Sequence, residues 1–283
     1  MFYGAILGDY IGSRFEFIEF KSKNFDLFDC QCSYTDDSIM TLAVMEACQR
    51  IKTEGYDVYE QVEQYFTEAM QKWGRAYPYV KGGYGNNFMN WIFNDDPKPY
   101  GSYGNGAAMR ASPCGWMFDT LEEVEKYGEW SAKPTHNHPE GLKAAKVTAG
   151  CVFLARTGHS KRQIYDYIKK NGYKLEKCDK VRPNYHFDVT CQGTMPVALE
   201  AFIESSSFED AIRIAMSMGG DADTIGAITG AIAEAFYGLP DEFKVKGEEI
   251  VKNILSHPTS TSGETVGEFD INNYIWFYFY KFE

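Results

Sequence analysis

Two short segments, almost two hundred residues apart, each combine two carboxylates with a threonine hydroxyl. The first is Thr35-Asp36-Asp37, and the second is Asp221-Ala222-Asp223-Thr224. Carboxylate and hydroxyl oxygens are hard ligands that suit Mg²⁺, Mn²⁺ or Ca²⁺. If the fold brings the two segments together, they would hold two metal ions. Two ions about 3.5–4 Å apart are a known means of activating water and holding a substrate.

Helix capping is the alternative explanation of each acidic segment. Asp and Thr are common at helix starts, where a side-chain oxygen accepts a hydrogen bond from a free backbone amide. Each segment opens an apolar, helix-like run, and Thr35 is a plausible N-cap with Asp36 and Asp37 in the first turn. Both roles stay open for each segment taken alone, whereas their shared composition favours a joint metal site.

Glu16 is a candidate general base. The run from Gly8 to Phe17 has a helical period with Gly8 and Gly12 on one face, and Glu16 lies two turns beyond Asp9. In the functional interpretation Glu16 accepts a proton or supports a metal-bound water. In the alternative it is a solvated residue of an ordinary amphipathic first helix.

Two further motifs suggest a binding cleft. Glycines in the segment from Gly104 to Arg110 would let backbone amides approach an anionic group, and a helix starting at Ala107 would supply free amides. His136 and His138 have no further nitrogen or sulfur partners at zinc-like spacing. We therefore expect His136 to form hydrogen bonds or to stack in a ligand pocket.

Helical periodicity dominates the chain and predicts an all-α fold. Apolar residues recur at helical spacing in the segments 36–51, 57–73, 141–157, 160–170, 194–204, 211–218, 224–237 and 241–255. Pro196 would fall in the first turn of its helix, where proline is tolerated. Gly226, Gly230 and Ala233 share one face of the 224–237 helix, which predicts close backbone packing against another helix.

Three segments depart from this pattern. Residues 74–116 are rich in Gly, Tyr, Asn and Pro, and predict long loops around short helices; such loops are usually functional. Residues 173–190 would include a short strand or an ordered loop. The aromatic tail, residues 271–283, would pack on the domain or form an interface. No linker or repeat is visible, so a single domain over residues 1–283 is expected.

Composition narrows the partners and the location. A net charge of −12 argues against broad binding to nucleic acid or anionic membrane, because the long-range field repels both. No apolar run is long enough to span a bilayer, and the first residues lack the basic region of a signal peptide. The seven cysteines are odd in number and lack zinc-like spacing, which favours reduced thiols and the cytoplasm.

Taken together, these motifs resemble those of the ADP-ribosylglycohydrolase family, which includes the dinitrogenase reductase-activating glycohydrolases. The resemblance covers nearly the whole chain, and the Thr-Asp-Asp and Gly-Gly-Asp-Ala-Asp-Thr pair is its most specific part. Tyr10 is a departure, because many relatives carry a small residue after Gly-Asp. The matching segments are Gly4–Asp9 with Gly12 and Glu16, Tyr34–Ser38, Gly104–Arg110 with Pro113, Thr135-His136, and Gly219–Thr224.

The resemblance implies a compact, single-domain orthogonal helical bundle with a binuclear Mg²⁺ centre, in which Mn²⁺ could replace Mg²⁺. It implies hydrolysis of the glycosidic bond at the distal ribose of an ADP-ribosyl conjugate, through an oxocarbenium-like transition state. Glu16 or Asp37 would accept the proton of the attacking water. The implied metal ligands are Thr35, Asp36, Asp37, Asp221, Asp223 and Thr224. The implied residues of the ADP-ribose cleft are Asn105, Gly106, Met109, Arg110 and His136.

Two rival functions fit parts of the same pattern. A non-catalytic ADP-ribose-binding or crystallin-like family member would keep the fold, but the complete set of ligand positions with Glu16 favours an enzyme. A two-metal nucleotide phosphohydrolase would release phosphate instead of ADP-ribose. The expected partner is an ADP-ribosylated protein or small-molecule conjugate. The sequence does not indicate whether its acceptor is arginine, serine, an acetyl ester or a nucleobase, nor the oligomeric state.

Overall fold

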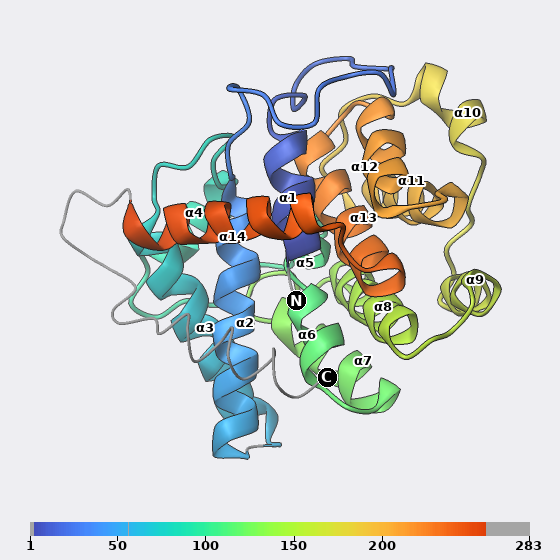
Figure 1. The fold of residues 1–283 in the computed structure, drawn as a ribbon. Helices are drawn as coiled ribbons and strands as arrows, with labels where there is room; N and C mark the ends of the chain where they lie inside the picture. Colours follow the sequence, from blue (N-terminus) through green and yellow to red (C-terminus); the bar gives the residue numbers. More distant parts are fainter. Residues whose placement is uncertain (1–2, 56, 259–283) are drawn as a thin grey trace.

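The computed structural model describes residues 3–55 and 57–258, and helices make up most of this part of the chain (Figure 1). They are α1 (Tyr3–Gly12), α2 (Asp36–Glu54), α3 (Tyr59–Ala76), α4 (Asn86–Ile92), α5 (Gly106–Met109), α6 (Ser112–Met117), α7 (Leu121–Ala132), α8 (Pro139–Arg156), α9 (Lys161–Lys170), α10 (Cys178–Val181), η1 (Arg182–Asn184), α11 (Cys191–Glu204), α12 (Phe208–Ser217), α13 (Ala222–Tyr237) and α14 (Asp241–Ser256).

The predicted all-α fold is confirmed. Among the described residues there is no strand, and the only β-type pairings are two isolated bridges, Thr35 with Lys81 and Gly104 with Thr190. Each of the helices predicted between residues 36 and 255 is present, with ends that differ by a few residues. Thr35 caps α2 as predicted, because its side chain accepts a hydrogen bond from the backbone amide of Asp37.

The centre of the fold is the crossing of α1 and α13, which lie side by side in Figure 1. Glycines meet there, as the small-residue face of α13 predicted. A Cβ built on Gly8 would lie 2.0 Å from the carbonyl oxygen of Gly226, and one built on Gly230 would lie 2.2 Å from that of Gly4. No side chain fits between the helices at these points, so their backbones touch directly.

A continuous hydrophobic core joins helices from both ends of the chain. It contains Leu7 and Ile11 of α1, Phe66 of α3 and Phe243 of α14, all essentially inaccessible to solvent. α14 runs across α1 on the face seen in Figure 1. Cys48 and Cys151 are buried in this core, as predicted. No helix of the described part is long and apolar enough to cross a membrane.

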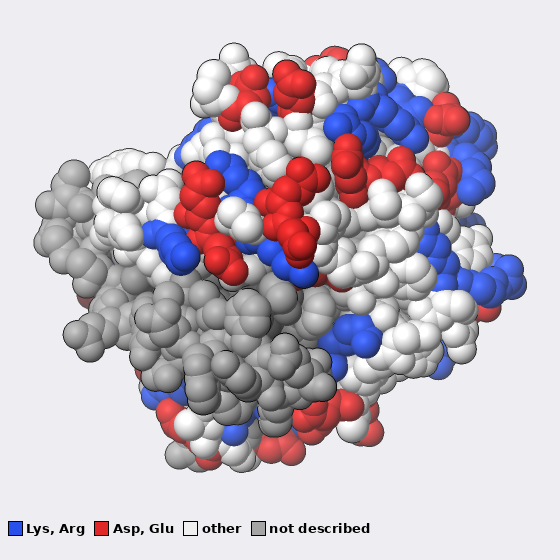
Figure 2. Space-filling model, in the orientation of Figure 1, with Lys and Arg blue, Asp and Glu red and all other residues white. Residues whose placement is uncertain are grey.

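The surface of this face carries charges of both signs. Figure 2 shows acidic side chains gathered over α14, next to scattered basic ones. α14 has Asp241 and Glu242 in its first turn, where the helix dipole favours negative charge.

Two helix predictions were wrong in detail. The run from Gly8 to Phe17 is not one helix, since α1 ends at Gly12 and Phe17 has a left-handed backbone (φ 65°) that turns the chain away. α11 begins three residues earlier than predicted, because Thr190 caps it by accepting from the amide of Gly193. Pro196 therefore lies inside the helix, where it cannot donate the usual hydrogen bond.

Residues 173–190 contain an ordered loop, one of the two predicted alternatives, together with the short helices α10 and η1 and no strand. α7 was not predicted, although Thr120 and Glu123 form a capping box at its start. The aromatic tail, residues 271–283, lies outside the described residues.

Candidate active site

A cleft of about 630 Å³ opens where the two acidic segments meet. Its walls come from parts of the chain that are far apart in sequence. They are Glu16 and Phe17 after α1, Asp36 and Asp37 of α2, residues 82–88, several residues between 100 and 110, His136, Phe187 and Val189, and Asp221, Asp223 and Thr224 at the start of α13.

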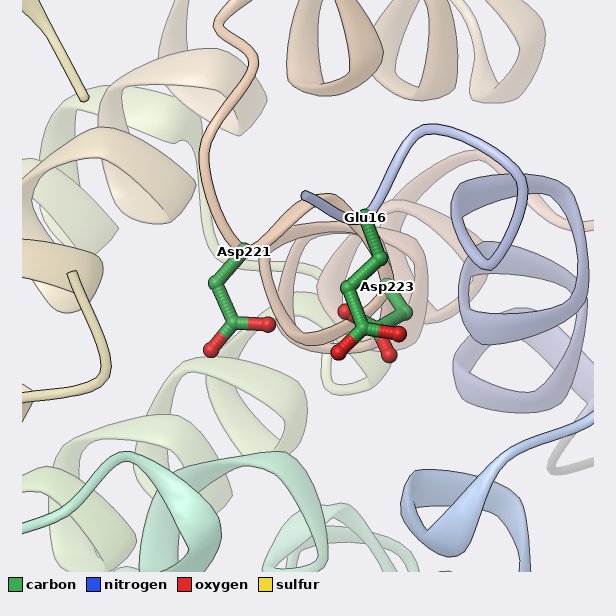
Figure 3. Close-up of side chains that lie close together, drawn as sticks. All are labelled: Glu16, Asp221 and Asp223. Carbon is green, nitrogen blue, oxygen red and sulfur yellow. The ribbon is translucent and has the colours of Figure 1, made fainter. Parts of the chain in front are cut away.

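Three carboxylates lie together at one end of the cleft. Oxygen atoms of Glu16, Asp221 and Asp223 lie within 4.8 Å of one another. Figure 3 shows Glu16 entering from the loop after α1 and the two aspartates from the start of α13. The fold thus brings the predicted base against the second acidic segment, although they lie about two hundred residues apart in sequence.

The first acidic segment reaches the same place. The hydroxyl of Thr224 donates to Asp37 Oδ2 at 3.3 Å, which joins the first turn of α2 to the first turn of α13. Asp36 lies close enough to Asp223 for their charges to interact strongly. The two helix starts therefore point their carboxylates at one another rather than at solvent.

Asp9 binds the start of α2 through hydrogen bonds. Its carboxylate is inaccessible to solvent and accepts hydrogen bonds from the amides of Thr35 and Ser38, both at 3.0 Å, and from both their hydroxyls. The sequence analysis gave Asp9 no role. A buried carboxylate under free helix amides stabilises this helix start and holds the orientation of Asp36 and Asp37.

Burial and mutual repulsion raise the pKa values of these acids. Desolvation, followed by the charges of Asp223 and Asp9, raises the pKa of Glu16 to about 8. Desolvation raises the pKa of Asp9 and of Asp221 to about 6. The pKa values of Asp36, Asp37 and Asp223 are raised well above their usual range, first by desolvation and then by neighbouring carboxylates. So many acids in one place are difficult to ionise together, and a bound cation would favour their carboxylate forms.

The donor set fits a hard divalent cation. Its atoms are carboxylate and hydroxyl oxygens, the type that Mg²⁺ and Mn²⁺ prefer. Asp37 Oδ1 is buried and has no hydrogen-bond partner, which is costly unless something else satisfies it. Capping does not explain the arrangement at the second segment, because Asp221 makes no side-chain cap on α13.

Asn105 connects the acidic end to the rest of the cleft. Its amide nitrogen donates to Asp221 Oδ2 at 2.6 Å and to the hydroxyl of Thr194 at 3.0 Å. Both amide hydrogens are therefore engaged. The predicted substrate-binding residue is, in this geometry, an orienting partner of Asp221.

A buried chain of polar groups lies further along the cleft. Arg110 donates to the hydroxyl of Thr135 at 2.7 Å, and that hydroxyl lies 2.7 Å from His136 Nδ1. The hydroxyl of Thr135 accepts from the guanidinium, which leaves its own hydrogen free for donation to Nδ1. The proton of the neutral imidazole is thereby assigned to Nε2, beside Gly104 and Gly106. Desolvation and then Arg110 keep the pKa of His136 well below its usual value.

Arg110 gives this part of the cleft a positive charge. Desolvation lowers its pKa to about 10, so it stays charged at neutral pH. Its guanidinium lies 5.5 Å from the centre of the Phe88 ring, and its Nε is buried without a partner. The cleft therefore has an anionic end suited to cations and a cationic, aromatic part suited to an anionic, ring-containing ligand.

The structure places all but one of the predicted site residues on the wall of this cleft. The exception is Thr35, which is fully buried with its hydroxyl bonded to Asp9. Sequence reasoning gave no site role to Asp9, Ser38, Thr135, Thr194, Tyr84, Phe88, Tyr100 or Phe187. The sequence offered one indication for Asp9, because it belongs to the matching segment Gly4–Asp9. Its hydrogen-bond partners in α2 can be identified only from the structure.

Comparison with known proteins agrees with the fold and identifies a family. The ADP-ribosylglycohydrolase family model matches residues 1–255. ADP-ribosylhydrolase ARH3 of Xenopus tropicalis is 25% identical over 87% of this chain and 89% of its own length. ADP-ribosylarginine hydrolase Tri1 of Serratia proteamaculans is 25% identical over 83% and 70%. ADP-ribosyl-[dinitrogen reductase] glycohydrolase of Rhodospirillum rubrum is 29% identical over 51% and 50%.

A solved structure shares the fold. It is described as an ADP-ribosylglycohydrolase-related protein complex, with a TM-score of 0.64, 23% sequence identity, and coverage of 88% of this chain and 92% of the other. With a family model that matches almost all of the described residues, the chain belongs to the ADP-ribosylglycohydrolase family.

Proposed function

We propose that this protein hydrolyses the glycosidic bond at the distal ribose of an ADP-ribosyl conjugate, in a reaction that depends on Mg²⁺, and releases ADP-ribose and the free acceptor. The observation that carries the proposal is the meeting of Glu16 with both acidic segments at one end of a cleft whose other walls carry Arg110 and His136. Family membership supports the same class of reaction.

Five residues on the cleft wall would hold two divalent cations: Asp36, Asp37, Asp221, Asp223 and Thr224. When bound, such ions supply positive charge that lowers the pKa of water and holds the ribose hydroxyls. Asn105 keeps Asp221 in place, and Asp9 keeps the first turn of α2 in place. Thr35 acts from behind the cleft wall through its contacts with Asp9 and Asp37.

The other walls would bind the ADP part of the substrate. The charged guanidinium of Arg110 suits a diphosphate, and His136 Nε2–H donates a hydrogen bond without adding charge. Phe88 and Tyr100 line the same region with aromatic rings that a base can stack against. Together these residues orient the distal ribose toward the carboxylate end.

The chemical step needs a group that accepts a proton from water. The oxygen of water forms the new bond to the anomeric carbon, and the bond to the acceptor breaks with its electron pair on the acceptor. Glu16 is the favoured proton acceptor, because it is only half-buried, whereas Asp37, the other candidate, is buried. The proton taken up by the base is then returned to the departing acceptor.

The substrate is expected to be an ADP-ribosylated protein or a small-molecule conjugate. The relatives include an ADP-ribosylarginine hydrolase and an ADP-ribosyl-[dinitrogen reductase] glycohydrolase. Arginine conjugates therefore belong in any substrate panel, beside serine conjugates, acetyl esters and modified nucleobases. Free thiols at all seven cysteines suit our expectation of a reducing, cytoplasmic setting.

The test is release of ADP-ribose from this panel, with Mg²⁺ and with EDTA. Asp221→Ala should abolish turnover and Mg²⁺ binding while circular dichroism shows an intact fold, and Asp241→Ala, at an exposed acid on α14, should behave as wild type. Unchanged turnover in Asp221→Ala would refute the metal assignment. Release of phosphate would favour a phosphohydrolase, and binding of ADP-ribose without any release would favour a non-catalytic protein.

A further inference from the structure

Two exposed phenylalanines stand together at the mouth of the cleft. Phe17 is 66% exposed and Phe187 is 43% exposed, and their ring centres lie 5.1 Å apart. Both line the cleft. Removing large apolar side chains from water lowers the free energy. Two exposed aromatic rings in contact at the entrance of a site therefore suggest that a ligand covers them.

Phe17 also has an unusual backbone. Among the described residues it is the only non-glycine residue with positive φ (65°). This conformation is unfavourable for a bulky residue and persists only where the surroundings impose it. The strain directs the ring outward immediately after Glu16, whose carboxylate turns inward toward Asp221 and Asp223.

The loops that carry the two rings are tied together. Lys21 donates to the carbonyl oxygens of Tyr185, at 2.5 Å, and Met218, at 2.6 Å. Glu19 pairs with His186 at 3.2 Å. Contacts of residues 19 and 21 with residues 185 and 186 therefore hold the two rings close to each other.

These ties also place the rings relative to the carboxylates. A Cβ on Gly220 would lie 3.1 Å from the carbonyl oxygen of His186, so the segment before Phe187 packs directly on the residue before Asp221. Phe17 follows Glu16. Each ring is thus one residue away from, or packed beside, a segment that supplies a carboxylate of the candidate site.

The location identifies which half of a substrate the rings would touch. In the proposed function, the ADP part lies toward Arg110 and His136, and the bond to be broken lies at the carboxylates. The acceptor must leave the cleft from the carboxylate end. The exposed rings stand at that end, on the side open to solvent.

We propose that Phe17 and Phe187 are specificity residues that contact the acceptor, and that they favour a flat, positively charged acceptor over one joined through an aliphatic hydroxyl. This inference rests on the proposed function. An aromatic face attracts a planar cation such as a guanidinium through its ring quadrupole. A serine side chain has no flat surface and gains little from the same contact.

Charge favours a cationic group on a protein over a nucleobase. A nucleobase has the flat face, but its strand brings phosphates toward a protein of net charge −12 and toward the carboxylates of Glu16 and Glu19 beside the rings. The same negative field attracts a peptide that carries a guanidinium.

The experiment compares two peptides that differ only in whether ADP-ribose is carried by arginine or by serine. The variants are Phe17→Gly, which removes the ring and relieves the positive φ, Phe187→Ala, and the double variant. Phe93→Ala is the matched control, since Phe93 is 52% exposed and lies outside the cleft. The readouts are kcat/KM for each peptide and the dissociation constant of free ADP-ribose.

We expect each variant to lose roughly 3- to 10-fold in kcat/KM on the arginine conjugate. On the serine conjugate the change should stay within about 2-fold, and the affinity for free ADP-ribose should not change. Equal losses on both peptides with weaker ADP-ribose binding would overturn the inference, because the rings would then hold the ADP-ribose half. Wild-type values throughout, or a loss only on a nucleobase conjugate, would overturn it as well.

Failure of the proposed function would be recognised separately. If the wild-type protein released nothing from any conjugate, the activity would be refuted, and the intact peptides could then be compared by equilibrium binding without turnover. A weaker dissociation constant of the variants for the arginine peptide alone would still support the contact. Equal constants for wild type and variants would refute it.

Discussion

Replacing Gly8 by alanine should push α1 away from α13 and disturb the candidate site. The added Cβ would lie 2.0 Å from the carbonyl oxygen of Gly226 and 2.3 Å from its carbonyl carbon. An ordinary carbon–oxygen contact is roughly 3.3–3.6 Å, so the two backbones must separate by about 1.3 Å or more. No side chain can move aside, because the atoms in the way belong to the main chain.

The size of the effect follows from this separation. Overpacking a core costs typically about 1–3 kcal/mol, and a backbone obstacle places Gly8→Ala at the upper end. Better helix propensity returns at most ~1 kcal/mol, so we expect a net loss of about 2–3 kcal/mol. A domain with a stability of roughly 5–15 kcal/mol stays folded after this loss.

Activity should suffer more than stability. Glu16 follows α1 in the chain, and Asp223 and Thr224 lie in the first turn of α13. A shift of about 1 Å between catalytic groups can lower turnover by about 100-fold. Gly8→Ala should therefore lose about that much ADP-ribose release at temperatures where it is fully folded.

Urea unfolding followed by circular dichroism measures the stability, and the conjugate assay measures the activity. Gly128→Ala is the graded comparison, because its added Cβ would make a tight contact at 3.2 Å with α8 rather than a clash at 2.0 Å, and Gly128 lies outside the cleft. It should lose less stability than Gly8→Ala and keep normal activity. A Gly8→Ala variant within about 0.5 kcal/mol of wild type, with wild-type turnover, would refute the reasoning.

Three further predictions concern buried carboxylates. Asp9→Asn should cost about 2–3 kcal/mol in urea unfolding, because it leaves amides of Thr35 and Ser38 without an ionised acceptor, and should weaken Mg²⁺ binding by calorimetry; full Mg²⁺ affinity would contradict its role. Asp37→Asn should raise the melting temperature in EDTA at pH 8, because it replaces a buried carboxyl group whose ionisation is opposed first by desolvation and then by neighbouring carboxylates, and should abolish the rise caused by Mg²⁺; a normal Mg²⁺ response would count against Asp37 as a ligand. Burial raises the pKa of Glu234 to about 7, so the folded state binds more protons than the unfolded state between about pH 4.5 and 7, and stability should fall by roughly 3 kcal/mol as pH rises through this window. Glu234→Gln should lack that part of the fall; identical pH profiles of the two proteins would refute the assignment.

The sequence predicts the helices and the acidic segments well because both are local features. Helical periodicity and Thr35 as an N-cap depend on residues within a few positions of one another. The small residues of α13 even predicted a close helix crossing. They did not identify α1 as the partner, because nothing local relates Gly226 to Gly8.

What the sequence could not give is the set of contacts between distant segments. Glu16 was wrongly predicted to lie in a helix, because its spacing continues the period of α1. In the structure α1 ends at Gly12, and Phe17 has a left-handed backbone. The capture of the α2 amides by Asp9 and the bond from Asn105 to Asp221 join residues separated by 26 and 116 positions. Such pairs are fixed by how helices pack, and pattern reading along the chain does not reach them.

The packing of α1 on α13 explains why the carboxylates do not relieve their repulsion by moving apart. Burial first, and then repulsion by neighbouring carboxylates, raise the pKa values of Glu16, Asp36 and Asp223, so ionising these groups is unfavourable when no cation is present. Gly8 and Gly226 leave the two helices no free space, so the unfavourable energy stays in the folded protein. A cation that binds there removes this repulsion, and the relief adds to its affinity. Gly8→Ala keeps every ligand but loosens the crossing, so it should bind Mg²⁺ more weakly than wild type. Equal Mg²⁺ affinity in calorimetry would mean that the helix crossing does not hold the repulsion in place.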